Sequence, residues 1–387
     1  MSKLRVGMVV DPWDLPFNGT VVSARRFVEA LSDDISFSIF MTPSRDAPLP
    51  AQAVLFDKLS IPGVNHIIDR MQAPVAKPNR RTLDEAMASL DVLHVQYPFF
   101  LAYGAIHAAR RAGIPVISSF HVQPENILKN LKLNFSPLVP VLYKLFVRAF
   151  YNAADHVVVP SQFAADLLVS HGTERPITVI SNGITPRFLK GHTIDKPMEG
   201  PPFLLLSVGR LAAEKQHDLI IDAVAKSNHR GHCHLRLVGS GPEKKRLERL
   251  AKTKGVQADI GPCSDDELLA LYERCDLFIQ ASTVELEGMS ALEAMAMACP
   301  VLLNHSKTSA LHELPALPDA FFSDKDSSEL THRVDQFLDS ASERSRHSAH
   351  NSAAALGRAH ERSAKQLLDL YHRVAKAPVT HPPVQAG

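Results

Sequence analysis

The sequence lacks several features that would assign it to a specialised class of protein. Its 387 residues contain no run of about 18 uncharged apolar residues, so no membrane-spanning helix is predicted. The 42 basic side chains are balanced by 41 acidic ones, giving a formal net charge of +1. Nucleic-acid-binding proteins usually carry an excess of Lys and Arg. We therefore expect no nucleic-acid partner, while attachment to a membrane surface stays open.

Cysteine is also scarce. The four cysteines, Cys233, Cys263, Cys275 and Cys299, are scattered without a C-x-x-C spacing, so neither a disulfide framework nor a zinc site is indicated. A reducing cytosol fits this usage best. The apolar segment from Leu4 to Val10 is too short for the core of a signal peptide and lacks a small-residue cleavage site. It is interpreted as a first buried strand.

Short apolar strands alternate with helix-length segments along the chain, which is typical of parallel sheets covered by helices on both faces. Because 387 residues exceed what one hydrophobic core supports, we expect an α/β protein with two doubly wound, Rossmann-like domains of about 190 residues each. The clearest strands cover residues 5–10, 36–40, 92–95, 115–119, 156–159, 177–180, 203–208, 234–238, 276–280 and 300–303.

The expected domain boundary is a polar segment, 191–202, which is interrupted by Pro and Gly and is interpreted as a linker. It would separate an N-terminal domain over 1–190 from a C-terminal domain over 203–362. The tail 377–387 has three prolines and no periodicity, so we expect it to be disordered. Two such domains predict a cleft that is lined by loops at the carboxyl ends of both sheets.

The most informative passage places two carboxylates, Glu285 and Glu293, eight residues apart around a glycine that opens a helix. The first carboxylate precedes the helix and can reach hydroxyl groups. The amides of Gly288, Met289 and Ser290 lie at the positive helix end, where phosphate binds. The arrangement suits a sugar attached to a diphosphate. The alternative is that Ser290 and Glu293 form a capping box that merely starts the helix.

Two cations follow the strand 203–208, Arg210 and Lys215, in a loop that leads into a helix. They can clamp a diphosphate and neutralise the charge that grows on a departing nucleoside diphosphate. The alternative is a solvated basic loop. The next strand ends in a turn with Gly239 and Gly241, which lets backbone approach a nucleotide, although many tight turns carry such glycines for conformational reasons.

Together these segments resemble the nucleotide-sugar domain of the retaining GT-B glycosyltransferases of family 4, the "group 1" glycosyltransferases. A finer pattern, His121-Val122-Gln123-Pro124-Glu125-Asn126 together with Glu285-Leu286-Glu287-Gly288-Met289-Ser290, resembles bacterial glycosyl-diacylglycerol synthases. The motifs that carry the resemblance are Ser207-Val208-Gly209-Arg210, Glu214-Lys215, Val238-Gly239-Ser240-Gly241-Pro242, Ala281-Ser282 and Glu293-Ala294-Met295-Ala296.

The resemblance implies a role for each matching residue. Arg210 and Lys215 would bind the donor diphosphate, Glu285 the transferred sugar and Glu293 the ribose hydroxyls. Family members usually have an aromatic or small residue where Glu287 stands, and this carboxylate either faces solvent or reaches toward the acceptor. The remaining donor contacts are implied at Gly209, Gly239, Gly241, Cys263 under the base, Gly288, Met289 and Ser290.

The first half carries a looser version of the family pattern. Gly19 follows the first strand in a loop that opens a helix, where it would contact donor or acceptor, although a plain turn is an equal alternative. His121 follows the strand 115–119 and resembles the family's cleft histidine, which implies a place near the transferred sugar. Residues 179–184 match the turn that ends the first domain. The stretch 363–376 would cross back onto that domain.

A basic and apolar segment, 126–154, contains no acidic residue before Asp155. Such a surface can lie among the headgroups of an anionic membrane. The alternative is an ordinary packed helix pair whose apolar side is core. The expected membrane contacts are Lys129, Lys132, Lys144 and Arg148.

No cofactor or metal ion is expected. The histidines and cysteine in 229–234 run into a buried strand without a second ligand cluster, and Asp324-Lys325-Asp326 is interpreted as a helix-capping loop. Arg210, Lys215 and the helix amides would supply the positive charge themselves.

The sequence thus predicts a metal-independent glycosyltransferase that moves a hexose from a nucleoside diphosphate sugar, most simply a UDP-sugar, to a membrane lipid such as diacylglycerol. The resemblance implies retention at the anomeric carbon without a covalent enzyme intermediate. The expected location is the cytoplasmic face of the bacterial inner membrane. The alternatives are a polysaccharide or lipid-linked oligosaccharide acceptor, or a non-catalytic nucleotide-sugar-binding regulator.

Overall fold

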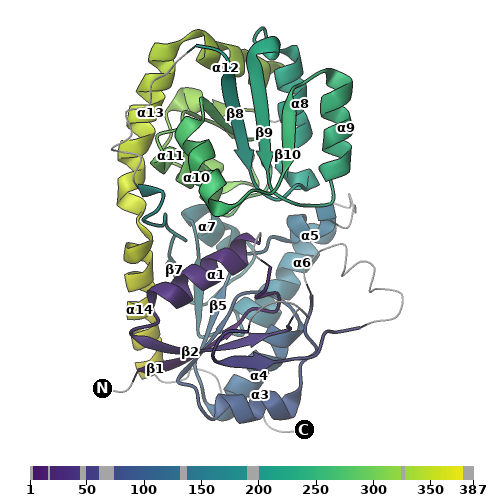
Figure 1. Cartoon of the computed structure of the whole chain (residues 1–387). Helices are drawn as coiled ribbons and strands as arrows, with labels where there is room; N and C mark the ends of the chain where they lie inside the picture. The colour runs from purple at the N-terminus through teal and green to yellow at the C-terminus, as the bar shows by residue number, and fades with distance from the viewer. Residues whose placement is uncertain are drawn as a thin grey trace. The chain divides into compact units, whose positions relative to one another are not determined.

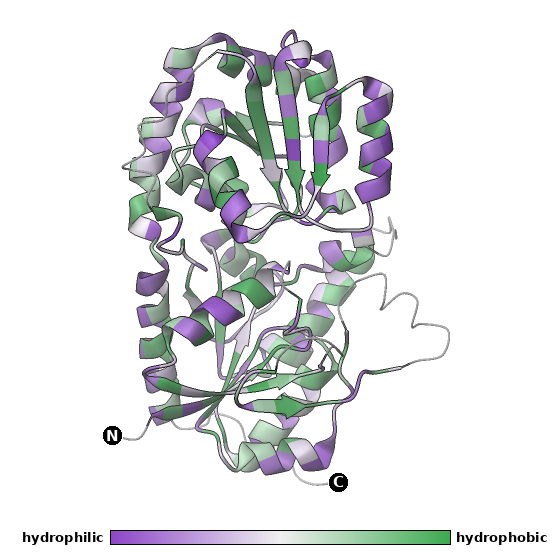
Figure 2. Cartoon of the chain, in the orientation of Figure 1, coloured by the Kyte–Doolittle hydropathy of each residue, from purple (hydrophilic) through white to green (hydrophobic). Residues whose placement is uncertain are grey.

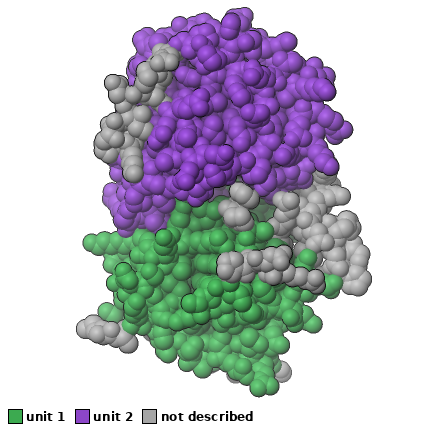
Figure 3. All heavy atoms as spheres, in the orientation of Figure 1, with its two compact units in different colours: residues 1–181, 363–387 green, residues 182–362 purple. Residues whose placement is uncertain are grey.

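A computed structural model describes residues 3–15, 18–43, 49–60, 74–130, 137–189, 200–323 and 327–377. The chain divides into two compact units (Figure 3). Unit 1 contains Met1–Ser181 and Ser363–Gly387, and unit 2 contains Asn182–Arg362. The chain therefore crosses between the units twice, at residues 181–182 and at residues 362–363. Most of the expected linker 191–202, and all but the first residue of the expected disordered tail 377–387, lie outside the described residues.

Unit 1 is built on a seven-stranded sheet with the order β3-β2-β1-β4-β5-β6-β7, in which every described pair of strands is parallel (Figure 1). The strands are β1 (Leu4–Val9), β2 (Ile35–Met41), β3 (Ala53–Leu55), β4 (Val92–Val95), β5 (Val116–Ser119), β6 (His156–Val159) and β7 (Ile177–Val179). The helices are α1 (Gly19–Ala30), α3 (Arg80–Met87), α4 (Phe100–Ala112), α5 (Pro124–Asn130), α6 (Leu138–Phe146), the π-helical turn η1 (Val147–Tyr151), α7 (Gln162–Ser170) and most of α14 (His360–Lys376).

The C-terminal helix α14 is part of the core of unit 1. Its Leu367 and Leu370 belong to the same buried cluster as Val6 and Met8 of β1. A buried polar link adds to this packing, because His94 of β4 bonds through Nδ1 to the Tyr371 hydroxyl at 2.8 Å and through Nε2 to Ser119 Oγ at 2.7 Å. Burial lowers the pKa of His94 to about 3, so the ring is neutral at physiological pH.

Unit 2 is built on a six-stranded parallel sheet with the order β10-β9-β8-β11-β12-β13 (Figure 1). Its strands are β8 (Phe203–Val208), β9 (Cys233–Val238), β10 (Ala258–Gly261), β11 (Leu277–Gln280), β12 (Val301–Asn304) and β13 (Phe321–Phe322). Its helices are α8 (His217–Lys226), α9 (Lys244–Lys254), α10 (Asp265–Arg274), α11 (Met289–Ala296), α12 (Ser327–Asp339) and α13 (Ala341–Ala355), with short 3₁₀ turns η3 (Ala213–Lys215), η4 (Arg230–His232), η5 (Ala310–Glu313), η6 (Pro318–Ala320) and η7 (Leu356–Arg358).

In unit 2 the hydropathy of an element depends on whether it lies inside the sheet or covers it. The central strand β8 is strongly apolar, whereas the covering helix α9 is largely hydrophilic (Figure 2). Strands β11 and β12 are buried along their whole length, as expected when helices cover both faces of a parallel sheet.

The predicted α/β fold with two doubly wound domains is confirmed, and all ten predicted strands are present. Three further strands, β3, β10 and β13, were not predicted. Each lies at the edge of its sheet and is only two to four residues long. A short edge strand is covered on fewer sides than a central one, so its sequence need not form a continuous apolar run.

Candidate functional site

The loops that follow β8 and β9 pack backbone against backbone. Gly209 donates its amide to the Val238 carbonyl at 2.9 Å, and Leu211 donates to Ser240 at 2.9 Å. A Cβ atom on Gly239 would lie 1.9 Å from the Gly209 carbonyl oxygen, closer than any real contact. Position 239 therefore requires glycine because the two loops pack too closely for a side chain. The same packing holds the loop that carries Arg210 against the loop after β9.

Gly241 is constrained in the same way, because its Cβ would lie 2.4 Å from the Leu211 carbonyl oxygen. Arg210 itself is half-buried in the loop after β8. The side chain of Lys215 lies against the same loop, since a Cβ on Gly209 would meet its Nζ at 3.8 Å. The two cations singled out by the sequence therefore belong to one small region at the carboxyl end of the sheet.

Lys215 and Glu285 form an ion pair across 70 positions of sequence, with both side chains largely buried. Gln280, the last residue of β11, donates to the same Glu285 oxygen at 2.7 Å. The Ser290 hydroxyl in turn donates to Gln280 Oε1 at 3.2 Å. Four polar side chains thus form one connected network at the start of α11.

Gln280 was missed by the sequence analysis. Its signal was an amide side chain at the carboxyl end of a buried strand, directly before Ala281-Ser282, where parallel sheets place binding residues.

Helix α11 begins at a glycine rather than at a capping box. Gly288 is the N-cap, with φ 89 and ψ 50 and no side-chain hydrogen bond. This left-handed conformation favours glycine, and a Cβ would also lie 2.5 Å from Leu311. Because Ser290 bonds to Gln280 instead of capping, the capping-box interpretation is wrong. The first amides of the helix have no partner within the helix itself, which suits them to an anion.

Glu293 lies in the second turn of α11 and is only 7% exposed. The buried Tyr272 hydroxyl donates to its Oε2 at 3.4 Å and to the Ser290 carbonyl at 3.2 Å. Burial raises the pKa of Tyr272 well above its ordinary value, so the phenol remains a donor at any physiological pH. Tyr272, a second residue that the sequence analysis did not identify, thereby orients Glu293.

Glu287 is buried at 5% exposure, so the interpretation in which it faces solvent is wrong. Its carboxylate accepts hydrogen bonds from the backbone amide of Asn182, at 3.1 and 3.2 Å, and from the Asn182 side-chain amide. These hydrogen bonds connect Glu287 to the segment where the chain enters unit 2.

The loop 261–264 follows β10. The Arg236 guanidinium donates to the carbonyls of Gly261, at 3.2 Å, and Pro262, at 3.3 Å. The partly exposed Cys263 has a free thiol whose pKa is raised by burial, so it is a neutral group here and not a reactive thiolate.

His121 and Gly19 lie in unit 1. His121 comes two residues after the end of β5, and Gly19 opens α1, the helix that follows β1. Although part of the His121 residue reaches the surface, desolvation lowers the pKa of its imidazole to about 4. Gly19 is the first residue of α1, where Asn18 caps the helix by accepting from the Thr20 amide at 3.1 Å. A Cβ on Gly19 would meet nothing within 4 Å, so packing does not explain this glycine.

The predicted membrane-contact residues lie in unit 1 as well. Lys144 and Arg148 are exposed, Lys129 is partly buried on α5, and Lys132 lies outside the described residues. Three apolar side chains beside the exposed cations are themselves exposed: Leu138 at 37%, Val141 at 58% and Leu145 at 56%. We call Leu138, Val141, Lys144, Leu145 and Arg148 the α6 surface. Their spacing places them on one helix face.

The opposite face of the same helical segment is core, since Tyr143, Phe146 and Phe150 are buried. The packed-helix interpretation therefore accounts for only part of the apolar residues in this segment.

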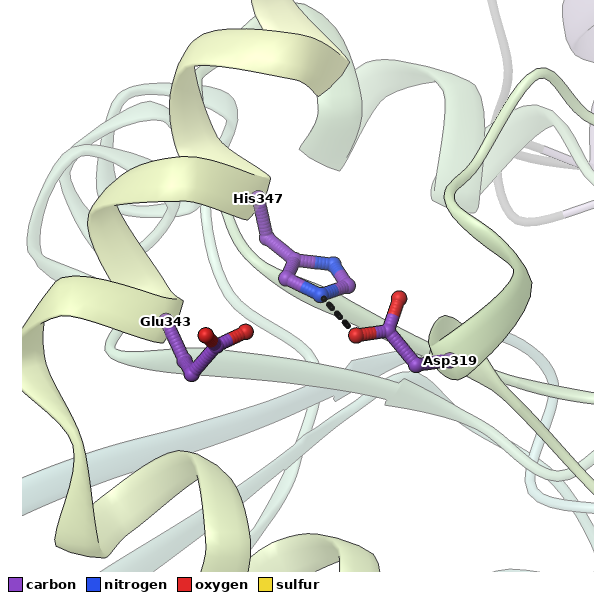
Figure 4. A group of neighbouring side chains, drawn as sticks. All are labelled: Asp319, Glu343 and His347. Carbon is purple, nitrogen blue, oxygen red and sulfur yellow. Dashed lines mark ion pairs between the residues drawn. The ribbon is translucent and has the colours of Figure 1, made fainter.

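One group of potential metal ligands occurs among the described residues, formed by Asp319, Glu343 and His347 (Figure 4). His347 Nε2 lies 3.2 Å from an Asp319 oxygen. The Arg346 guanidinium bonds to Asp319 and, at 2.6 Å, to Glu343, so both carboxylates are already paired with a cationic side chain. We interpret the group as an ion-pair network. Asp324-Lys325-Asp326 lies outside the described residues.

Taken together, these observations define a class of protein. Two parallel-sheet Rossmann-like units form the GT-B fold, and unit 2 carries paired cations, a glycine-started helix and two buried carboxylates at the carboxyl end of its sheet. This combination is that of a GT-B glycosyltransferase.

Comparison with known families makes the assignment specific. Residues 17–188 match the model "Glycosyltransferase Family 4", and residues 194–354 match "Glycosyl transferases group 1". The chain belongs to the family 4, or group 1, glycosyltransferases.

Curated relatives share about a quarter of their residues with this chain. Alpha-monoglucosyldiacylglycerol synthase of Streptococcus pneumoniae is 25% identical over 315 residues, which cover 77% of this chain and 70% of the relative. GDP-mannose-dependent alpha-mannosyltransferase of Corynebacterium glutamicum is 25% identical over 310 residues, covering 78% and 72%. Among solved structures, Anabaena Alr3699/HepE in complex with UDP and glucose has a TM-score of 0.72 at 16% identity, covering 96% of this chain and all of that one.

Within the described residues, no helix combines the length and apolar character needed to cross a membrane.

Proposed function

We propose that this glycosyltransferase moves a hexose from a UDP-sugar to a membrane lipid, with diacylglycerol as the most favoured acceptor. The transfer retains the configuration at the anomeric carbon and needs no divalent cation. The observation that carries the proposal is the convergence of Lys215 and Glu285 at the start of α11.

The proposed donor, a nucleoside diphosphate sugar, is supported by the positive charge of the site. A nucleoside diphosphate carries its negative charge on the oxygens that become the leaving group, and this charge grows as the glycosidic bond breaks. Lys215, Arg210 and the first amides of α11 supply fixed positive charge for those oxygens. Stabilising the leaving group in this way is the task that a divalent cation performs in other transferases, so the proposed site works without one.

The carboxylates complete the site. Glu285 is held by Lys215 and Gln280 with an orientation suited to hydroxyl groups of the sugar. Glu293, oriented by Tyr272, is proposed to accept hydrogen bonds from the ribose. In unit 1, a neutral His121 is proposed to donate or accept a hydrogen bond at the sugar without adding charge. Retention without a covalent enzyme intermediate would have the departing diphosphate accept the proton of the incoming hydroxyl on the same face.

The acceptor half has separate support. Two curated relatives, from Streptococcus pneumoniae and Acholeplasma laidlawii, are named as alpha-monoglucosyldiacylglycerol synthases, at 25% and 23% identity. The α6 surface places Val141 and Leu145 beside Lys144 and Arg148, so apolar and cationic groups are exposed together. Such a surface fits the headgroup region of an anionic bilayer, where the acceptor lipid resides.

The test is direct. The purified protein is incubated with labelled UDP-glucose and diacylglycerol in vesicles that contain phosphatidylglycerol, and the lipids are separated by chromatography. We expect a labelled glycolipid whose anomeric configuration, read by NMR, matches that of the donor, and equal turnover with EDTA. An inverted product would refute retention, and loss of activity with EDTA would refute metal independence.

Relatives named as GDP-mannose-dependent mannosyltransferases favour a second candidate, in which the donor is GDP-mannose. Parallel incubations with GDP-mannose, and with polysaccharide or lipid-linked oligosaccharide acceptors, separate the possibilities. If only these alternatives yield product, the diacylglycerol proposal fails. If none of them is a substrate but nucleotide sugar still binds, the protein is a binding regulator.

Membrane contact is tested by vesicle sedimentation. Replacing Val141 and Leu145 by Ser should lower binding to anionic vesicles about tenfold or more, because their apolar area no longer enters the bilayer. The control is Val169→Ser on α7, an apolar side chain that is equally exposed at 59%. Equal binding by the α6 variant and the control would refute the α6 surface as the contact.

A further inference from the structure

The two places where the chain crosses between units are paired within unit 2. Ile184 donates its amide to the Arg358 carbonyl at 2.8 Å, and His360 donates its amide to the Ile184 carbonyl at 2.9 Å. Ile184 and Ala359 form a parallel β-bridge. The entering segment 182–184 and the leaving segment 358–360 therefore run side by side, although about 175 residues of sequence separate them.

A side-chain bond strengthens this pairing. His360 Nδ1 lies 2.8 Å from the Asn182 carbonyl oxygen, and because that oxygen can only accept, Nδ1 carries the proton and donates. Both residues are buried, at 4% and 5% exposure. A hydrogen bond shielded from water is less easily exchanged than one on the surface, so it holds the two segments in one register.

Glu287 ties these paired segments to the loop that starts α11. Its carboxylate accepts from the backbone amide and the side-chain amide of Asn182. Hydrogen bonds to a buried carboxylate are stronger than those between neutral groups, so breaking them costs more free energy. The same loop carries Glu285 on one side of Glu287 and Gly288 on the other.

We propose that Glu287, Asn182 and His360 are positioning residues for glycosyl transfer. Their hydrogen bonds hold the loop 285–288, which we call the donor loop, in a fixed position relative to the segments 182–184 and 358–360 where the chain crosses between the units. The kinetic part of this inference rests on the proposed function. The loop is fixed on one side by Lys215 and Gln280 and on the other by Asn182, so a displacement at either crossing moves Glu285 and the start of α11. Binding and catalysis at the loop are thereby coupled to the crossings, and the coupling acts in both directions.

The coupling can be tested without any substrate, by hydrogen–deuterium exchange of the full-length protein. Glu287→Gln keeps the side-chain shape but removes the charge. We expect exchange of the Ile184 and His360 amides to rise at least tenfold. In the reverse direction, Asn182→Ala should speed exchange at Ala310, whose amide donates to the Glu285 carbonyl, and at Leu292, whose amide donates to Gly288.

The matched control is Glu329→Gln on α12. Glu329 is also a carboxylate of unit 2 that accepts from a backbone amide, that of Ser323 at 3.0 Å. This variant should leave exchange at both crossings and in the donor loop within twofold of wild type. Should Asn182→Ala not fold, His360→Gln tests the same connection from its outer end. The coupling would be overturned if amide exchange stayed within twofold of wild type both at the crossings in Glu287→Gln and in the donor loop in Asn182→Ala or His360→Gln.

Kinetics then distinguish positioning from a merely structural role. We expect Glu287→Gln and Asn182→Ala each to lower kcat per folded molecule about tenfold with little change in the donor KM, and the double variant to be no worse than either single one. A purely structural role would reduce the folded fraction and leave kcat per folded molecule unchanged. Because exchange is measured without donor, failure of the UDP-sugar proposal would leave the exchange result intact and readable.

Discussion

The ammonium group of Lys215 is paired with the carboxylate of Glu285, and the two residues come from opposite sides of β11 in the sequence. A diphosphate that binds Lys215 must compete with this carboxylate or bind beside it. The pair therefore sets both the charge and the orientation of the site, since Gln280 holds the same Glu285 oxygen.

Lys215→Ala should lower kcat/KM for the donor at least about a hundredfold, the effect of removing one donor of positive charge from a transition state. The measurement is steady-state kinetics with the nucleotide sugar that proves to be the substrate. Lys226→Ala is the matched control, because this lysine of α8 bonds to Ser327 Oγ at 2.6 Å. The control should stay within twofold of wild type, and near-normal activity of Lys215→Ala would contradict the assigned role.

Gly239→Ala should destabilise unit 2 and impair donor turnover together. The new Cβ would lie 1.9 Å from the Gly209 carbonyl oxygen, so the loop that carries Arg210 must shift. Overpacking of this kind costs about 1–3 kcal/mol of unfolding free energy. Urea denaturation measures the loss. Gly231→Ala is the control, because its Cβ would meet nothing within 4 Å, and equal stability of the two variants would refute the packing argument.

The sequence predicts the parts of this site whose signal is local. Gly288 before an apolar helix, and Arg210 and Lys215 after a buried strand, are recognisable because each motif lies within a few residues of the element that presents it. The central strands were predictable for the same reason, since burial on both faces requires an apolar run.

What the sequence could not predict are contacts between distant residues. Glu287 meets Asn182 across 105 positions, and Tyr272 meets Glu293 through a helix packing that no motif records. Burial of a carboxylate depends on the partner it finds, and a partner 105 residues away leaves no local pattern. The approach of Gly239 to Gly209 is another contact of this kind. The sequence leaves both a nucleotide contact and a conformational role open for this glycine, and its packing against Gly209 requires glycine whether or not a nucleotide binds.

Stability should fall as the pH drops from about 6 to about 5. Burial lowers the pKa of His94 to about 3, of His121 to about 4 and of His217 to about 3, from 6.5. These rings stay neutral in the folded protein and take up protons on unfolding. Asp11 opposes them, because burial raises its pKa from 3.8 to about 7 and its folded form binds a proton earlier.

These four groups together take up about two protons on unfolding, so they should lower the unfolding free energy, summed over both units, by about 3 kcal/mol per pH unit. Urea denaturation at about pH 6.0, 5.5 and 5.0 measures this slope. His217→Gln should flatten it by about one proton, and Asp11→Asn should steepen it by the same amount. A slope near zero in the wild-type protein would show that these histidines are protonated in the folded state.

Gln216→Gly should stabilise unit 2 by about 0.5–1 kcal/mol. Gln216 caps α8 with φ 47 and ψ 42, a left-handed conformation that costs a residue with a side chain about 1–2 kcal/mol, and it makes no side-chain cap bond. Glycine removes that strain, while its greater freedom in the unfolded chain cancels part of the gain. Gln216→Ala is the control, since it removes the same buried amide but keeps the strained backbone. Thermal unfolding should place the glycine variant above both wild type and the alanine variant, and an alanine variant as stable as the glycine variant would assign the effect to the side chain instead.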